Sequence, residues 1–129
     1  MFIHTSIRTS NMNRSIDFYT RFLDLVLVNR REISQNDAEI AFMKNRGGRG
    51  CTLELTFYYA QKNFVQAEYE NRIFDHIAFE VEDLKGIVDQ MKKERVVVTD
   101  EPFKLSPKGP LIAFVEDPDG ILVELIQKD

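Results

Sequence analysis

The stretch Ile3-His4-Thr5-Ser6-Ile7-Arg8 decides the fold, because its pattern returns later in the chain as Asp75-His76-Ile77-Ala78-Phe79-Glu80. The sequence contains only two histidines, and they occupy the same position in the two copies, 76 − 4 = 72 residues apart. The residues that follow keep the same offset, with Met12, Ile16 and Asp17 corresponding to Leu84, Val88 and Asp89. The repeat predicts two structural units of the same design.

A second repeated stretch places a glutamate near the end of each half. Gly50-Cys51-Thr52-Leu53-Glu54-Leu55 corresponds to Gly120-Ile121-Leu122-Val123-Glu124-Leu125, at an offset of 124 − 54 = 70. Each glutamate lies between two apolar residues, which is typical of a strand that buries one face and directs the acid to the other. Each half therefore has one His near its start and one Glu near its end.

Alternation, helical periodicity and capping residues predict the same order of elements in both halves. In the first half we expect a strand at residues 2–8, a helix that Asn11 or Asn13 caps and that runs to about Leu23, and three strands at residues 25–28, 39–43 and 51–59. In the second half we expect the same order at residues 75–81, 83–95, 96–99, 111–115 and 121–127. Such units are too small to bury a sheet face alone. We therefore predict an α+β fold in which two paired βαβββ modules form a half-open barrel, as one domain of residues 1–129: module 1 at about 1–59, a connector at 60–73 and module 2 at about 74–129.

The composition is that of an ordinary globular domain, with 43% hydrophobic and 29% charged residues in 129. The net charge is −4 without a basic run, so nucleic acid is not an expected partner. No apolar run approaches the roughly 20 residues of a membrane span, and no secretory signal is visible, so a cytoplasmic location is expected. The single cysteine, Cys51, is expected to fill the core rather than to act as a nucleophile.

Strand alternation directs His4, Glu54, His76 and Glu124 away from the core faces of their strands. Two imidazoles and two carboxylates form a mixed nitrogen and oxygen ligand set, which predicts a metal site with positions left for water or substrate. Such a set suits tetrahedral Zn²⁺ and also octahedral Ni²⁺, Co²⁺, Mn²⁺ or Fe²⁺. A carboxylate beside the ion can take a proton from carbon and return it one atom away.

Four further residues are candidates for substrate binding. Arg8 shares a strand face with His4 and suits an anionic group; the alternative is a solvent-facing arginine. Tyr58 is either a wall of the substrate pocket or part of the core. Arg72 and Lys108 lie in expected loops that can reach the mouth of a cleft, and the alternative for each is ordinary surface charge.

Several motifs in this sequence resemble those of the glyoxalase I family (lactoylglutathione lyases), within the vicinal oxygen chelate superfamily. The resemblance spans essentially the whole chain and lies in six segments: His4-Thr5-x-x-Arg8, Arg14 to Thr20, Leu53-Glu54-Leu55-Thr56, His76-Ile77-Ala78, Ile112 to Gly120, and Val123-Glu124-Leu125-Ile126. The Asp117-Pro118-Asp119-Gly120 turn is shared across the superfamily. The His, Glu, His, Glu set is more discriminating.

The resemblance implies a homodimer with two active sites at its interface, where each site takes a His and a Glu from one subunit and a His and a Glu from the other. It implies that His4, Glu54, His76 and Glu124 bind one divalent metal ion per site, with Ni²⁺ or Co²⁺ favoured by the short chain and Zn²⁺ also suitable. The implied reaction converts the hemithioacetal of methylglyoxal and glutathione to S-lactoylglutathione through an enediolate. Glu124 matches the catalytic base, and Glu54 serves from the other side.

This sequence also departs from the family pattern, so other substrates and other functions remain alternatives. The family commonly has an Asn gripping the glutamyl end of glutathione just after the Glu-Leu-Thr run, where this chain has Phe57-Tyr58-Tyr59. A different small thiol is therefore an alternative substrate. Methylmalonyl-CoA epimerases share the fold but usually have Gln at the position of Glu54. Dioxygenases and fosfomycin-type transferases use three ligands, and drug-binding members of the fold lack the ligand set.

Overall fold

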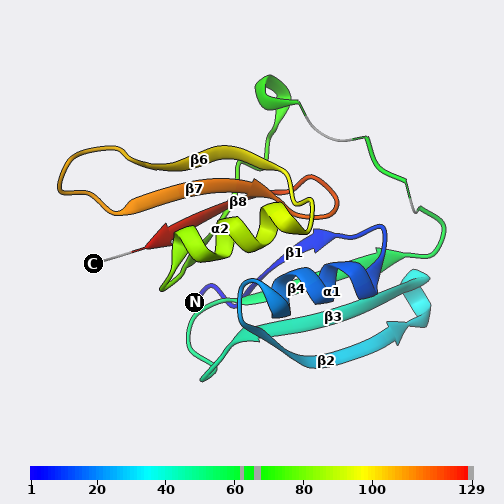
Figure 1. The fold of residues 1–129 in the computed structure, drawn as a ribbon. Helices are drawn as coiled ribbons and strands as arrows, with labels where there is room; N and C mark the ends of the chain where they lie inside the picture. Colours follow the sequence, from blue (N-terminus) through cyan, green and yellow to red (C-terminus); the bar gives the residue numbers. More distant parts are fainter. Residues whose placement is uncertain (62, 66–67, 128–129) are drawn as a thin grey trace. The chain divides into compact units, whose positions relative to one another are not determined.

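The computed structural model describes residues 1–61, 63–65 and 68–127, which fall into two compact units, Met1–Val65 and Gln66–Asp129. Both units have the order strand, helix, strand, strand, strand (Figure 1). The elements of the first unit are β1 (His4–Arg8), α1 (Met12–Arg21), β2 (Leu25–Ile33), β3 (Ala38–Asn45) and β4 (Thr52–Tyr58). Those of the second are β5 (Ile77–Glu80), α2 (Leu84–Lys93), β6 (Val98–Lys104), β7 (Leu111–Glu116) and β8 (Leu122–Gln127). The predicted α+β class and the two βαβββ units are confirmed.

In the first unit, four strands form a mixed sheet in the order β1-β4-β3-β2, and only β1 and β4 pair in parallel. Helix α1 begins after Asn11, whose side chain accepts a hydrogen bond from the backbone N–H of Arg14 at 3.0 Å. Its buried residues, Phe18 and Tyr19 among them, face the sheet, where Leu55 is fully buried. The opposite face of β4 is thereby left to polar side chains.

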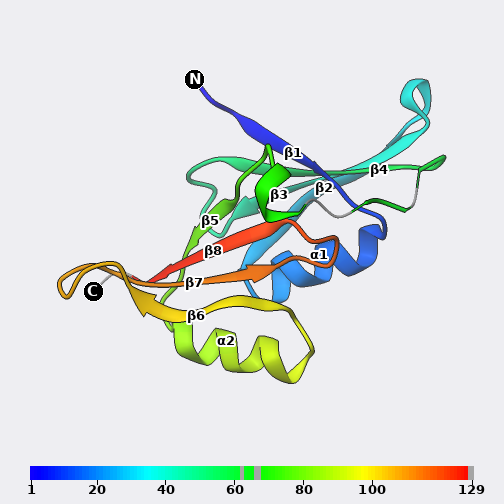
Figure 2. The same ribbon diagram turned by 90° about the horizontal axis from the view of Figure 1, so that it is seen from above.

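The second unit repeats this plan with the strand order β5-β8-β7-β6, in which β5 and β8 pair in parallel (Figure 2). Helix α2 begins after Asp83, which accepts from the backbone N–H of Gly86 at 3.1 Å. Leu84, Val88 and Met91 lie on the buried stripe of α2, which packs on β6, β7 and β8. Both units therefore cover one sheet face with a helix.

Three predictions about the strands and Cys51 were wrong. Strand β2 continues to Ile33, and β6 runs over Val98–Lys104 rather than 96–99. Pro102 fits within β6 because this strand lies at the sheet edge and its register shifts between Asp100 and Phe103. Cys51 is exposed rather than in the core, because the glycine-rich turn before β4 extends through it and the strand begins one residue later.

The turn before β8 is built around the buried side chain of Asp117. Its Oδ1 accepts hydrogen bonds from the backbone N–H groups of Asp119 and Ile121, each at 2.9 Å. Replacing Asp117 with Ala is expected to lower the free energy of unfolding by about 1–3 kcal/mol, because two partly buried N–H groups lose a charged acceptor. Urea unfolding measures the loss. Asp117→Asn, which keeps an acceptor oxygen, is the matched control; an Ala variant as stable as the wild type contradicts the role.

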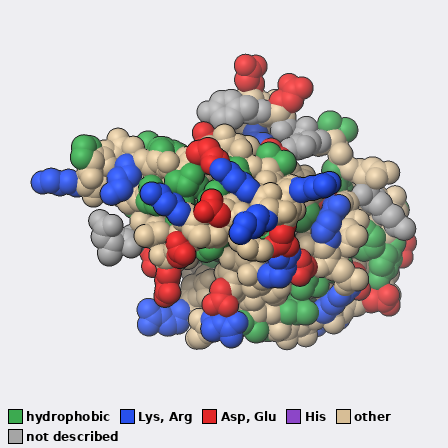
Figure 3. All heavy atoms as spheres, viewed as in Figure 1, with side chains coloured by type: hydrophobic (Ala, Val, Ile, Leu, Met, Phe, Trp, Pro, Cys, Tyr) green, Lys and Arg blue, Asp and Glu red, His purple; other side chains and the backbone are tan. Residues whose placement is uncertain are grey.

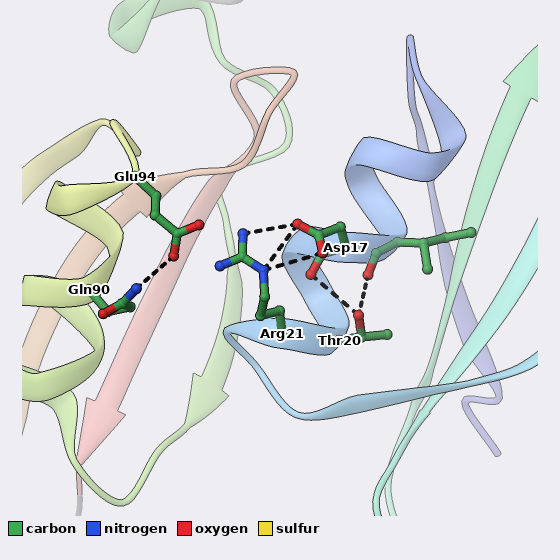
Figure 4. A network of polar contacts seen from close by, with 6 residues as sticks. Asp17, Thr20, Arg21, Gln90 and Glu94 are labelled. Atoms are coloured by element: carbon green, nitrogen blue, oxygen red, sulfur yellow. Dashed lines mark hydrogen bonds and ion pairs between the residues drawn. The ribbon is translucent and has the colours of Figure 1, made fainter.

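The helix surfaces carry exposed polar pairs. On α1, Arg21 forms an ion pair with Asp17 at 2.9 Å, and near the end of α2 the amide of Gln90 donates to Glu94 at 2.9 Å (Figure 4). Exposed pairs of this kind contribute only about 0.3–0.5 kcal/mol each.

On the face shown in Figure 3, acidic and basic side chains are interspersed. Within the described residues, neither α-helix, at 10 residues each, has the length and apolar character needed to cross a bilayer.

Candidate functional site

In the second unit, His76 and Glu124 lie side by side on the sheet face opposite α2. His76 immediately precedes β5, and Glu124 lies in the middle of β8, opposite Ala78 of β5. The neighbours of Glu124 in sequence, Val123 and Leu125, are fully buried, so the carboxylate points the other way, as predicted. The distance from His76 Nε2 to Glu124 Oε2 is 2.8 Å, and the side chains are 33% and 15% exposed.

In the first unit, His4 and Glu54 occupy the matching strands β1 and β4. Glu54 lies opposite Ser6 in the parallel pair and has buried leucines on both sides in sequence. The hydroxyl of Thr56 donates to Glu54 Oε1 at 3.2 Å, and the hydroxyl of Ser6 is 2.9 Å from that of Thr56. Since Thr56 has a single hydroxyl proton, Ser6 is the donor in the second bond. Glu54 is therefore held by a short chain of hydroxyl groups.

A phenylalanine that the sequence reasoning missed completes each pair. The His4 ring meets Phe42 edge-on at 5.6 Å between centroids, and the His76 ring meets Phe114 at 5.5 Å. The phenylalanines lie opposite Glu54 and Glu124 in the strand registers. The available signal was the repeat itself, since 114 − 42 = 72 is also the offset between the histidines. Each phenyl ring restricts its imidazole and forms an apolar wall beside the carboxylate.

The donor atoms of the second pair fit a bound metal ion. Two ligand atoms at about 2.1 Å from an ion, on adjacent coordination positions, lie roughly 3 Å apart, close to the observed 2.8 Å between His76 Nε2 and Glu124 Oε2. No three His, Cys, Asp or Glu side chains gather as a ligand set within the part of the chain that the structure describes. The geometry thus brings together one nitrogen and one oxygen donor in the second unit, and the full four-ligand set stays a prediction.

Arg8 and Tyr58 are in contact in the first unit. The guanidinium of Arg8 lies over the Tyr58 ring, 4.8 Å from its centroid, and its NH1 group donates to Gln61 Oε1 at 2.6 Å. Sequence reasoning missed Gln61, because its position depends on the turn in which its backbone N–H bonds the Tyr58 carbonyl at 3.1 Å. The cluster orients one cation at the end of β4 and leaves further guanidinium N–H groups available for an anion.

The neighbouring Tyr59 is unsuited to proton transfer. Its phenol donates to Glu32 at 2.7 Å, and this hydrogen bond, with burial and nearby acids, raises the pKa of Tyr59 to about 12. It therefore stays protonated near neutral pH.

The two other predicted substrate-binding residues lie in the second unit. Arg72 donates from NH1 to the carbonyl oxygen of Gly120 at 3.1 Å, which ties it to the turn before β8. Lys108 is exposed at the tip of the β6–β7 hairpin, where the N–H of Gly109 bonds the carbonyl of Ser106 at 3.0 Å. For both residues, a role in substrate binding stays a prediction.

The chain is similar to known proteins in both sequence and fold. The model of the Glyoxalase/Bleomycin resistance protein/Dioxygenase superfamily matches residues 2–125. The chain is 34% identical to a probable lactoylglutathione lyase of Vibrio cholerae, over 97% of this chain and 88% of that protein. The trypanothione-dependent glyoxalase I of Leishmania major is 31% identical, with a TM-score of 0.81 over 98% of this chain and 86% of its own. Maize glyoxalase I is 26% identical with a TM-score of 0.81, and the chain spans 44% of it. The chain therefore belongs to the Glyoxalase/Bleomycin resistance protein/Dioxygenase superfamily.

Proposed function

We propose that this protein is a lactoylglutathione lyase-type enzyme that detoxifies methylglyoxal. Its substrate is the hemithioacetal of methylglyoxal and a small thiol, and its product is the S-lactoyl thioester. The observation that carries the proposal is the His-Phe-Glu arrangement, present once in each unit with the same register. The relatives named lactoylglutathione lyase, 30% or more identical over nearly the whole chain, support it.

The proposal includes one divalent metal ion per site, bound by His4, Glu54, His76 and Glu124. Ni²⁺ or Co²⁺ is favoured by the family resemblance of this short chain, and the mixed ligand set also accommodates Zn²⁺. When bound, the ion supplies Lewis-acid stabilisation of negative charge on the substrate oxygens. We further propose a homodimer whose subunits each contribute one His–Glu pair to a site, as the family resemblance implies.

In the proposed reaction, the two glutamates move the proton. Glu124 takes the proton from the hemithioacetal carbon C1, and the electron pair left behind gives an enediolate. Returning this proton to the adjacent carbon C2 restores the carboxylate, and transfer of the C1 hydroxyl proton to the C2 oxygen completes the thioester, so atoms and charge balance. The Phe114 ring, opposite Glu124 in the strand register and edge-on to His76, forms an apolar wall beside the carboxylate and favours this role. Glu54, bound by Thr56, serves from the opposite side.

Arg8 is proposed to bind the anionic end of the thiol. The resemblance leaves the thiol open, because Tyr58 stands where the family commonly has an amide, and the Leishmania relative is described as trypanothione-dependent. Here the guanidinium is stacked on the phenol ring of Tyr58 and bonded to Gln61. This arrangement supports recognition of a carboxylate by the remaining N–H groups.

Arg8→Ala is expected to raise KM for the thiol adduct about 10-fold or more with little change in kcat, because the lost contact lies away from the reacting carbons. Steady-state kinetics at saturating metal measures both constants. Arg49→Ala removes the same charge from an exposed loop of the same unit and serves as the control. A fall in kcat at unchanged KM contradicts the assignment.

The function is tested by thioester formation with defined metals. Protein stripped with a chelator is loaded with Ni²⁺, Co²⁺ or Zn²⁺, and the absorbance of the thioester is followed with methylglyoxal plus glutathione, then with other small thiols. Metal-dependent turnover with at least one thiol supports the proposal. Metal binding without turnover with any thiol contradicts the lyase activity, and failure to bind metal indicates a non-catalytic binding protein of the same fold.

A further inference from the structure

We propose that Asp75 is a positioning residue that holds His76 with its ring proton on Nδ1, so that Nε2 is the metal-binding nitrogen. The Asp75 carboxylate oxygen Oδ1 lies 2.5 Å from His76 Nδ1, on the side of the ring opposite Glu124. The inference rests on the proposed role of His76 as a ligand. Asp75 supports His76, and His4 has no corresponding residue.

Hydrogen-bond chemistry fixes the direction of the contact. An ionised carboxylate accepts and cannot donate, so each contact is a hydrogen bond only when the facing ring nitrogen carries a proton; the shorter contact, at 2.5 Å to Asp75, favours Nδ1 as the donor. A neutral imidazole has one N–H group, and its other nitrogen then presents a lone pair. With the proton on Nδ1, that nitrogen is Nε2, which faces Glu124 Oε2 at 2.8 Å. Two lone pairs at this distance repel one another, so the arrangement favours a cation between Nε2 and Glu124.

Without Asp75, the ring proton has a different partner. Glu124 is then the remaining carboxylate in contact with His76 among the described residues, and it accepts a proton carried on Nε2. A metal ion binding at Nε2 has to displace that proton. A carboxylate on the far nitrogen of a metal-binding histidine typically improves metal affinity about 10–100-fold by fixing the tautomer and the ring orientation.

In the first unit, no carboxylate residue directly precedes His4. The residue that precedes His4 is Ile3, which corresponds to Asp75 at the offset 75 − 3 = 72 and has no side-chain acceptor. In the described part of the chain, the contact that orients the His4 ring is the edge-on packing of Phe42. The two otherwise matched histidines therefore differ in one feature, and His4 provides an internal reference for His76.

The size of the effect is limited by solvent. The Asp75 side chain is 81% exposed, so water competes for both partners and weakens the bond. We therefore expect Asp75→Ala to weaken metal binding about 3–10-fold, at the low end of the usual range for such partners. Asp75→Asn keeps an oxygen that accepts from Nδ1–H, and it is expected to restore most of the loss.

The first test reads the tautomer directly in metal-free protein. Because the chain has two histidines, ¹⁵N-histidine labelling gives an NMR spectrum of two rings, recorded in alkaline solution to observe the neutral tautomers. In the wild type, the His76 proton is expected on Nδ1; in Asp75→Ala it is expected to move to Nε2, and in Asp75→Asn it stays on Nδ1. The His4 signals stay unchanged throughout. A wild-type His76 protonated on Nε2, or a tautomer that Asp75→Ala leaves unchanged, overturns the proposal.

The second test measures the dissociation constant of Ni²⁺ by competition with a chelator. The control is Asp89→Ala, which removes the same charge from the exposed side of α2 and is expected to leave the affinity unchanged. Equal Ni²⁺ affinities for wild type and Asp75→Ala overturn the positioning role while the proposed function stands. If the wild type itself binds no metal, the proposed function fails, and the tautomer measurement still decides whether Asp75 positions His76.

Discussion

Replacing Glu124 with Gln is expected to lower kcat by about 10²–10⁴-fold, the usual contribution of a positioned general base. Glutamine has the size of glutamate and its carbonyl oxygen can remain near His76, but it does not take up a proton at neutral pH. The backbone of β8 is fixed by the fully buried Val123 and Leu125, so the fold is expected to persist. The measurement is steady-state kinetics at saturating metal, with metal content determined on the same sample.

The metal content of the Glu124→Gln variant separates loss of the base from loss of the metal. Glu82→Gln removes an equal charge at an exposed position just before α2 and is expected to keep full activity. Glu54→Gln provides the comparison between the two halves. A Glu124→Gln enzyme that holds its metal and retains most of the wild-type kcat would falsify the assignment of Glu124 as the base.

The architecture of both units was predictable because its cause is local. Alternating apolar residues fix which strand face is buried, and Asn11 and Asp83 mark the helix starts with side chains that accept backbone N–H groups. The errors came where the context of the sheet outweighs sequence pattern. Pro102 lies within β6 because an edge strand with shifted register tolerates a residue that lacks an N–H group.

The candidate site was predictable only in part, for a similar reason. The repeat identified both histidines and both glutamates, since period-two alternation sets the direction of a strand side chain. Phe42 and Phe114 required the register of β3 on β4 and of β7 on β8, which sequence alone does not provide. Strand alternation does not identify Asp75, because it places Asp75 and His76 on opposite faces of the strand. Its carboxylate reaches Nδ1 because His76 lies just before β5 begins, outside regular strand geometry.

Replacing His76 with Ala is expected to weaken metal binding by more than about 100-fold, beyond the 10–100-fold typical of residues that only support a ligand. The substitution removes one nitrogen donor and leaves Glu124 facing the space from which the imidazole is lost. The same loss is expected to reduce turnover to near background at metal concentrations that saturate the wild type. Competition with a chelator gives the affinity, and elemental analysis gives the metal content.

Stability provides the control for this variant. His76 is one-third exposed and packs edge-on against Phe114, so its removal is expected to cost no more than about 1.5 kcal/mol. A folded His76→Ala protein that has lost its metal therefore separates ligand loss from unfolding. His4→Ala is predicted to lose the metal as well, since both histidines belong to the proposed ligand set. If only one substitution abolishes metal binding, the duplicated His–Glu pairs do not act together, and the four-ligand proposal has to be replaced by a site within a single unit.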